Sequence, residues 1–302
     1  MKAFYSDRFV LPLPSGHRFP MQKYRMLREA VAASLPDVVF EEAPTTSDGV
    51  LALAHHPSYI QRVSGGLLSE NEQKTIGFPW SPDMVERSRR SAGATIAACR
   101  AALAGGVGVN LAGGTHHAHA DRGQGFCVFN DAAIAARLMQ AERRVSRVAI
   151  VDLDVHQGDG TATILEKDES VFTLSIHGEH NYPFDKACSD LDVALPDGTG
   201  DTDYLAGLDA ALSEMFARFD PELLIFLAGA DPYKGDRLGR LRLSMAGLAS
   251  RDTKVMEAAR ARDLPVAIAM AGGYGRVIEE TVAVHLQTIR IAIRYCRGME
   301  LA

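Results

Sequence analysis

The chain has 302 residues, of which 47% are hydrophobic and 23% are charged. This composition is typical of a globular protein, and the length is sufficient for one large domain with an extensive core. The formal net charge of −6 and the absence of a long lysine or arginine run argue against nucleic acid as a direct ligand.

The predicted secondary structure alternates between short apolar strands and longer helices. In chain order the strands are Ala3–Ser6, Val38–Glu41, Val107–Ala112, Val148–Leu153, Val171–Ile176, Leu223–Ala228 and Pro265–Ala271. The helices are Met21–Leu35, Asp83–Ala104, Asp131–Ala141, Thr202–Phe219, Ser244–Ala261 and Glu279–Arg297. This alternation predicts a parallel sheet with helices on both faces.

The four cysteines are far apart and form no CxxC pair, which argues against a disulfide framework. The N-terminal segment lacks the apolar core of a signal peptide, and no apolar stretch is long enough to span a bilayer. We therefore expect a cytoplasmic protein. No internal repeat or long linker interrupts residues 1–302, so a single domain is predicted.

Polar residues follow five of the predicted strands directly. In chain order these segments are GGTHHAHA, DVHQGDG, His177, GAD and GGYG. Ligands of parallel α/β folds bind beyond the carboxyl ends of the strands. We therefore expect these segments to converge on one site.

The segment from Asp152 to His156 predicts a metal site. In an extended chain Asp152, Asp154 and His156 share one face. One imidazole with carboxylates suits zinc or a similar divalent ion, and Asp231 at the end of another strand can supply a third ligand. The alternative is a polar network that caps the strand without a metal.

Adjacent histidines at 116 and 117 follow a glycine turn, where both can face a pocket. Such a pair can divide the proton transfers of amide hydrolysis, with Asp152 and Asp159 as the groups that orient the rings. A second pair, His55 and His56, has no glycine turn and is interpreted as loop or helix-start structure. The remaining candidates, His119, His177 and His180, are expected to support the site or lie on the surface.

Tyr274 lies in the glycine turn Ala271–Gly275, where its hydroxyl can donate a hydrogen bond to a developing oxyanion. A phosphate loop is the alternative for this turn. The chain has neither GxGxxG after a strand nor GxxxxGK[ST], so nucleotide binding is not supported.

These motifs resemble those of the histone deacetylase family. GGTHHA, GQGFCVFND, VDLDVHQGDGT, LSIH, SDLDVALPDGTGD, AGADPYKGDRLG and AGGY occur in the order found in histone deacetylases and their bacterial relatives. The resemblance covers nearly the whole chain and implies a catalytic domain with the arginase/deacetylase-like three-layer αβα sandwich around a mainly parallel sheet. Gln157, where many members have a second histidine, resembles the class IV branch.

The resemblance implies a role for each site residue. Asp154, His156 and Asp231 would hold Zn²⁺, or Fe²⁺, while His116 and His117 would form the base/acid pair oriented by Asp152 and Asp159. Tyr274 would polarise the substrate carbonyl. The substrate would also meet Gly125, Phe126, Tyr182, Leu238, Gly272 and Gly273. Structural K⁺ would be held by Asp152, Asp154, His156, Ser175 and Ile176.

The leading hypothesis is therefore zinc-dependent hydrolysis of an acylated lysine in a protein or peptide. The alternatives are deacetylation of a small amine, such as an acetylpolyamine, and an acyl-lysine-binding protein without turnover. An arginase-like ureohydrolase is disfavoured, because AGADP supplies one aspartate where that design needs more. The sequence indicates neither an acyl-chain length nor an oligomeric state.

Overall fold

The computed structural model describes residues 1–14 and 16–296 and is organised around one eight-stranded sheet. The strand order is β2-β1-β3-β8-β7-β4-β5-β6, and all neighbouring strands pair in parallel. The strands are β1 (Lys2–Tyr5), β2 (Val39–Glu42), β3 (Val107–Asn110), β4 (Val148–Asp152), β5 (Val171–Gly178), β6 (Leu191–Leu195), β7 (Leu223–Leu227) and β8 (Val266–Ala269). The predicted parallel sheet is confirmed.

Each of the six predicted helices corresponds to a long helix in the structure. The helices are α1 (Gln22–Ser34), α2 (Asp48–Leu51), α3 (Pro57–Ser64), α4 (Glu70–Ile76), α5 (Pro82–Gly105), α6 (Asp131–Ala141), α7 (Asp159–Leu165), α8 (Asp201–Arg218), α9 (Met245–Arg260) and α10 (Ile278–Ala292). For the last prediction, α10 ends at Ala292 and a 3-10 helix continues over Ile293–Tyr295, while Arg297 lies outside the described residues. Within the described part of the chain, no helix is both long and apolar enough to cross a membrane.

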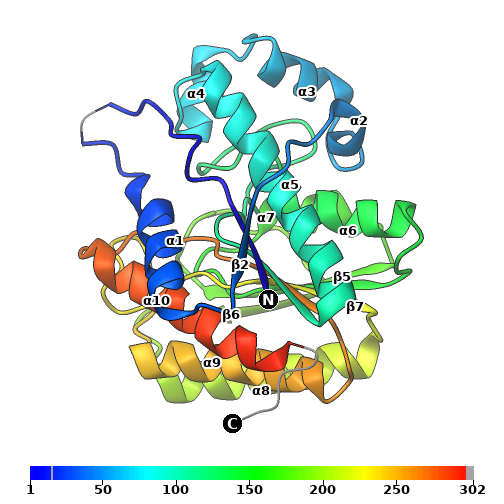
Figure 1. Cartoon of the computed structure of the whole chain (residues 1–302), viewed down its shortest axis with the longest axis vertical. Coiled ribbons are helices and arrows are strands. Elements are labelled where there is room, and N and C mark those ends of the chain that lie inside the picture. The colour runs from blue at the N-terminus through cyan, green and yellow to red at the C-terminus, as the bar shows by residue number, and fades with distance from the viewer. Residues whose placement is uncertain (15, 297–302) are drawn as a thin grey trace.

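Helices cover both faces of the sheet, so the fold has three layers (Figure 1). Alternate residues of β4 show the division. Val148 and Ile150 belong to the core that includes α5 and α6, whereas Ala149 and Val151 belong to the core that includes α8, α9 and α10. Both cores are apolar at the centre of the sheet, which leaves the polar strand ends as the place for a site.

Two helix starts follow from local side-chain chemistry. Ser81 accepts a hydrogen bond from the backbone N–H of Met84 at the start of α5, and Pro82 occupies the first turn. Asn130 caps α6 in the same way, through the N–H of Ala133. The Asn130 amide also donates to the carbonyl of His116 at 3.3 Å, and so ties α6 to the segment after β3.

Candidate active site

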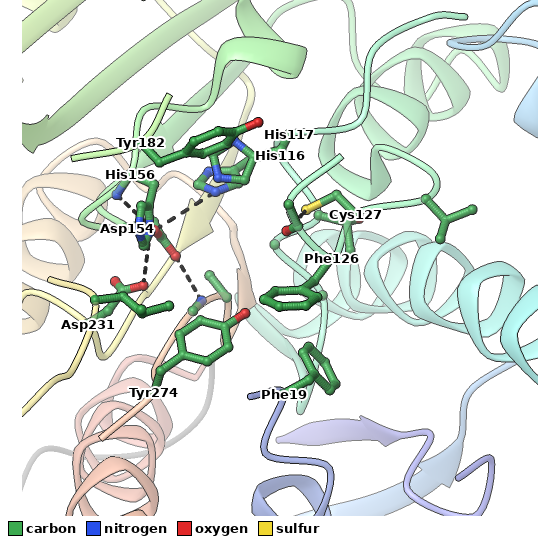
Figure 2. Close-up of a pocket in the computed structure, with 18 of the residues that line it drawn as sticks. Phe19, His116, His117, Phe126, Cys127, Asp154, His156, Tyr182, Asp231 and Tyr274 are labelled. Carbon is green, nitrogen blue, oxygen red and sulfur yellow. Dashed lines mark hydrogen bonds and ion pairs between the residues drawn. The ribbon is translucent and has the colours of Figure 1, made fainter. Parts of the chain in front are cut away.

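The polar residues that follow the strands lie together at one edge of the sheet. Four consecutive strands of the sheet, β3, β8, β7 and β4, are followed by His116, Tyr274, Asp231 and Asp154 respectively. Figure 2 shows these side chains around one pocket. The convergence expected from the sequence is therefore confirmed for four of the five segments, whereas His177 lies within β5 beside Ser175 and is not among the residues that line the pocket.

Asp154, His156 and Asp231 form a group suited to a metal ion, because their ligand atoms all lie within 4.8 Å of one another. His156 Nδ1 lies 2.9 Å from Asp154 Oδ1 and 3.4 Å from Asp231 Oδ2. Although Asp231 Oδ2 is buried, it has no hydrogen-bond partner among the described residues. A divalent cation would satisfy that oxygen.

The backbone beside this group is shaped to leave the carboxylates accessible. Gly272 donates its N–H to Asp154 Oδ2 at 2.8 Å, and any side chain at position 272 would collide with Asp231 Oδ2. A buried carboxylate oxygen without a partner is costly. The donor set and the space around it therefore fit a divalent ion such as zinc.

The pKa values of the group reflect carboxylates placed close together. Burial and the charge of Asp154 raise the pKa of Asp231 to about 6. Burial lowers the pKa of His156, but the adjacent carboxylates of Asp154 and Asp231 outweigh this effect and raise the pKa to about 10. The imidazolium thus supplies positive charge to the two acids, and a bound metal ion would displace its proton.

His116 and His117 each bind a carboxylate through Nδ1. His116 lies 2.6 Å from Asp152 Oδ2, and His117 lies 2.6 Å from Asp159 Oδ1. All four residues are buried, and the two histidine rings are 4.1 Å apart between centroids. These are the pairings expected from the sequence, and they leave Nε2 of each ring available for chemistry.

The two histidines differ in charge. Burial lowers the pKa of His116, but the charges of Asp152 and Asp154 outweigh it and raise the pKa to about 9. Burial and the neighbouring charge of His116 lower the pKa of His117 to about 4. At neutral pH the pair therefore combines a cationic ring with a neutral one, an arrangement suited to an acid and a base.

Asp159 is held by three partners. Besides His117, it accepts hydrogen bonds from His119 at 3.1 Å and from the amide of Gln124 at 2.6 Å. Burial raises the pKa of Asp159, but the histidine hydrogen bonds outweigh it and hold the pKa well below its ordinary value. His119 thus supports the site, whereas His180 is exposed and lies 3.3 Å from Asp197.

Tyr274 is fixed through its backbone and leaves its hydroxyl free. The Tyr274 N–H donates to Asp236 Oδ2 at 2.6 Å, and its carbonyl accepts from Arg237. The hydroxyl has no hydrogen-bond partner among the described residues. Burial raises the pKa of this tyrosine well above its ordinary value, so the hydroxyl keeps its proton and can donate it in a hydrogen bond.

A cavity of about 470 Å³ connects the metal group with the surface. Its wall includes most of the predicted substrate-binding residues, namely Gly125, Phe126, Tyr182, Leu238 and Gly272, but not Gly273. The Tyr182 ring packs edge-on against His117, with 5.0 Å between centroids. Tyr182 and Phe126 thus lie on the cavity wall as expected, with Phe126 on the side of Tyr274 (Figure 2).

Phe126 reaches the cavity from a strained backbone position, with a positive φ of 66°. Such a conformation costs a non-glycine residue about 1–3 kcal/mol and persists only where the surroundings enforce it. Here the N–H groups of Gly125 and Phe126 donate to the carbonyls of Thr75 and Ile76, at 3.1 and 2.7 Å. The end of α4 therefore positions this wall.

The opposite wall belongs to residues 179–187, a segment held in place by hydrogen bonds from the side chains of Gln157 and Lys186. Gln157 donates to the Ala187 carbonyl at 2.9 Å and accepts from its N–H at 2.8 Å. Lys186 donates to three carbonyls of the same segment, those of Glu179, Asn181 and Pro183. Gln157 therefore anchors the segment that carries Tyr182, while its class IV assignment stays a prediction.

The predicted potassium ligands come from two adjacent strands. Asp152 and Ser175 are paired in register between β4 and β5, and Ile176 follows directly. The Ser175 hydroxyl lies 3.0 Å from Nδ1 of buried His177. The proximity of these residues agrees with the expectation, and potassium itself stays a prediction.

The sequence did not reveal Arg251, a fully buried residue of α9 beneath the site. Its guanidinium donates to the carbonyls of Leu153 and Gly229, at 3.3 and 2.6 Å, and pairs with Asp252. Arg251 thus braces the two segments that carry Asp154 and Asp231. Arg251 is flanked in the sequence by Ser250 and Asp252, so its neighbours gave no signal that it would be buried.

One local prediction was wrong, although the grouping it produced was right. The strand β4 ends at Asp152, and the chain bends from Asp154 to His156. The bend is stabilised because the N–H of Asp154 donates to Asp152 Oδ1 and the N–H of His156 donates to Asp154 Oδ1. A turn closed by carboxylates, and not strand alternation, brings these residues together.

Comparisons with known proteins agree with the motifs. Residues 17–289 match the model of the histone deacetylase domain. An uncharacterized protein of Picosynechococcus sp. is 41% identical over 93% of this chain and 94% of its own length. Histone deacetylase 2 of Arabidopsis thaliana is 40% identical over 64% of this chain and 52% of its own length. The crystal structure of an HDAC homolog from Aquifex aeolicus superposes with a TM-score of 0.83 at 22% identity, over 96% of this chain and 83% of that one. The chain is therefore a member of the histone deacetylase family, with a buried Asp–His–Asp metal site.

Proposed function

We propose that this protein hydrolyses the amide bond of an acylated lysine in a protein or peptide. The proposal rests on one observation: the metal group, the histidine pair and Tyr274 all line a single cavity that opens to solvent. Amide hydrolysis needs an activated water, a proton donor for the amine and a donor for the oxyanion. This cavity offers a candidate for each.

The roles follow from the contacts. A bound zinc ion, or iron(II) at the same ligands, supplies Lewis-acid chemistry for the carbonyl and lowers the pKa of water. His117 is neutral and held by Asp159, and we assign it as the base that accepts the proton of the attacking water. His116 is cationic and held by Asp152, and we assign it protonation of the leaving lysine amine. The Tyr274 hydroxyl donates to the carbonyl oxygen.

The charge of the cavity wall favours a peptide over a polyamine. Its exposed cationic or titratable residues are Arg18, His180 and Arg240. Among the described lining residues, the only carboxylates are the metal ligands Asp154 and Asp231. An acetylpolyamine substrate carries further ammonium groups that would need acidic partners, whereas the side chain of an acyl-lysine is neutral.

The test compares an acetyl-lysine peptide with an acetylpolyamine on zinc-loaded protein. We expect hydrolysis that chelation abolishes and zinc restores, with kcat/KM for the peptide higher by at least about tenfold. Tyr274→Phe should lower kcat by about 100-fold while the zinc content is unchanged. Product formation without metal would contradict the metal assignment, and a preference for the polyamine would contradict the substrate. Binding without any product would support an acyl-lysine-binding protein.

Potassium is the second ion that we propose. Asp152, Asp154 and Ser175 would contribute side-chain oxygens, and His156 and Ile176 would contribute carbonyls. A cation there would offset the charge of the aspartates and steady the zinc ligands. Activity that depends on added K⁺ after dialysis into a large organic cation, and zinc retention that follows it, would support the site.

A further inference from the structure

The cavity that holds the metal group also has a buried end with a different chemistry. Its exposed residues include His180, Phe184 and Arg240, whereas Leu11, Tyr24, Arg87 and Ser91 are buried. The buried set comes from the N-terminal segment, α1 and α5 and includes none of the residues assigned to catalysis. The cavity therefore offers space to a substrate beyond the reacting amide.

Arg87 is the unusual member of this end. Its side chain lies on the cavity wall with only 7% of the residue exposed. It donates to the Phe9 carbonyl at 3.3 Å, and its guanidinium carbon lies 4.5 Å from the centroid of the Tyr24 ring. A guanidinium has five N–H groups. These contacts leave some of them without a partner among the described residues.

No carboxylate forms an ion pair with Arg87 in the described part of the chain. Asp7 is the nearby acid, but it is paired with Arg28, whose Nε lies 2.9 and 3.0 Å from its two oxygens. A buried cation without an anion is costly, since burial removes its hydration. The cavity end is therefore suited to an anionic group.

A second buried cation nearby, Lys23, is held by other groups and does not face the cavity, so it is not available to an anionic ligand there. Lys23 donates to the carbonyls of Ala271 and Gly273, at 3.2 and 3.4 Å, and its ammonium lies over the rings of Tyr24 and Tyr274. Lys23 is not among the cavity-lining residues. Its charge adds to the positive potential around Arg87 without offering a contact.

Phe19 places Arg87 in relation to the reacting group. The Phe19 ring lies 6.4 Å from the Tyr274 ring and 5.9 Å from the Arg87 guanidinium carbon. Phe19 also packs against Phe126, with 5.4 Å between centroids. If the acyl carbonyl is held by Tyr274, the acyl chain can run along the ring of Phe19, and its far end then approaches the Arg87 guanidinium.

Resting on the proposed deacylase function, we propose that Arg87 binds a carboxylate at the far end of the acyl group. The substrates would then be lysines acylated by short dicarboxylic acids, such as succinyl-lysine and glutaryl-lysine. In the reaction water adds to the acyl carbon, the C–N bond breaks, the lysine leaves as an amine and the free dicarboxylate is released. The apolar wall of Phe19 and Leu11 would contact the methylene carbons, and Arg87 would contact the terminal oxygens.

The experiment measures kcat/KM for one peptide whose lysine carries a butyryl, succinyl or glutaryl group. We expect the better dicarboxylic acyl group to exceed butyryl by at least about tenfold, the effect of one charge-assisted hydrogen-bonded pair. Arg87→Met should remove this preference, and Arg87→Lys should keep part of it. Arg89→Met is the matched control, since Arg89 lies two residues along α5, outside the cavity lining, and should leave the ratio unchanged.

Other outcomes separate this inference from the deacylase assignment. Equal kcat/KM for the three peptides, or equal losses on all of them in Arg87→Met, would overturn the carboxylate site. Peptide binding to the Tyr274→Phe protein, measured by fluorescence anisotropy, is a readout that needs no turnover. Tighter binding of the dicarboxylic peptides to this variant, with no hydrolysis of any peptide by the zinc-loaded wild type, would retain the carboxylate site and refute the deacylase. Weaker inhibition by acetate in Arg87→Met, with acyl preference unchanged, would assign Arg87 to the released product and overturn the inference.

Discussion

Two histidine dipeptides in this chain have the same sequence and opposite surroundings. His116 and His117 bind carboxylates through Nδ1, line the cavity and keep Nε2 free. His55 lies 2.9 Å from the His119 carbonyl through Nδ1 and accepts the N–H of Asn130 through Nε2 at 2.9 Å. The first pair faces a site, while His55 has both ring nitrogens occupied by the backbone.

The difference shows that partners, and not the dipeptide, determine what a histidine does. Nearby carboxylates raise the pKa of His116 to about 9, whereas burial lowers the pKa of His55 to about 4. His55 still serves the site indirectly, because it fixes Asn130, whose amide donates to the carbonyls of His116 and Ala118. One pair is placed for chemistry, and the other contributes a fold contact that supports it.

The largest expected contrast is in turnover. His117→Gln removes the neutral imidazole that we assign as the proton acceptor, and general-base catalysis contributes about 10²–10⁴-fold. We expect kcat to fall by at least about 100-fold, with the melting temperature and zinc content close to wild type. Retained turnover in a folded, zinc-loaded variant would remove His117 from the mechanism.

The converse experiment replaces the buried member of the other pair. His55→Leu leaves the Asn130 N–H and the His119 carbonyl without their partner, and a buried unsatisfied group costs about 1–3 kcal/mol. We expect a loss of unfolding free energy of about that size in urea denaturation, while the folded protein retains most of its turnover. A larger effect on kcat than on stability would mean that the two pairs are not separable.

A pH titration sharpens the same contrast. His55 stays neutral in the fold down to about pH 4, but protonates in the unfolded chain below its ordinary pKa of 6.5. As the pH is lowered through this window, the wild-type protein therefore loses unfolding free energy. A variant without the imidazole does not have this loss. The stability advantage of wild type over His55→Leu should shrink by about 1–2 kcal/mol between pH 7 and pH 5. A constant difference would show that His55 takes up its proton in the fold.

The smallest effect is expected at His56. This residue is exposed at the N-cap of α3 and makes no side-chain capping hydrogen bond. His56→Ala should change the unfolding free energy by less than about 0.5 kcal/mol and leave kcat within about twofold. It is therefore the control for both larger variants, and a loss comparable to that of His55→Leu would place an unseen contact at this surface.

The sequence predicted the structure correctly where a local pattern of residue types is compatible with few structures. Apolar runs such as Leu223–Ala228 predicted the central strands to within about two residues, and glycine turns after strands located the site residues. The metal group was predicted because imidazole and carboxylates at strand ends have few other uses. Strand β6 was missed, since Asp192 interrupts its apolar residues at the edge of the sheet.

What could not be predicted depends on contacts between distant segments. Nothing near Arg251 in sequence indicates that its guanidinium reaches the carbonyls of Leu153 and Gly229. The same holds for Gln157, whose partners lie about 30 positions away, and for Arg87, whose nearby acid Asp7 is paired with Arg28. Such features are relations between side chains brought together by the fold.

The two backbone hydrogen bonds from Gly125 and Phe126 to the end of α4 carry a consequence for how this protein can diverge or be redesigned. Because peptide groups make the contact, the side chain of exposed Thr75 can be exchanged without releasing the phenylalanine, whereas fully buried Ile76 must stay apolar. An insertion or deletion in α4, by contrast, would displace the cavity wall as a unit. We therefore expect insertions or deletions in α4, at a distance from the catalytic residues, to change which substrates fit the cavity. Single substitutions at the exposed positions of α4 should have little effect on it.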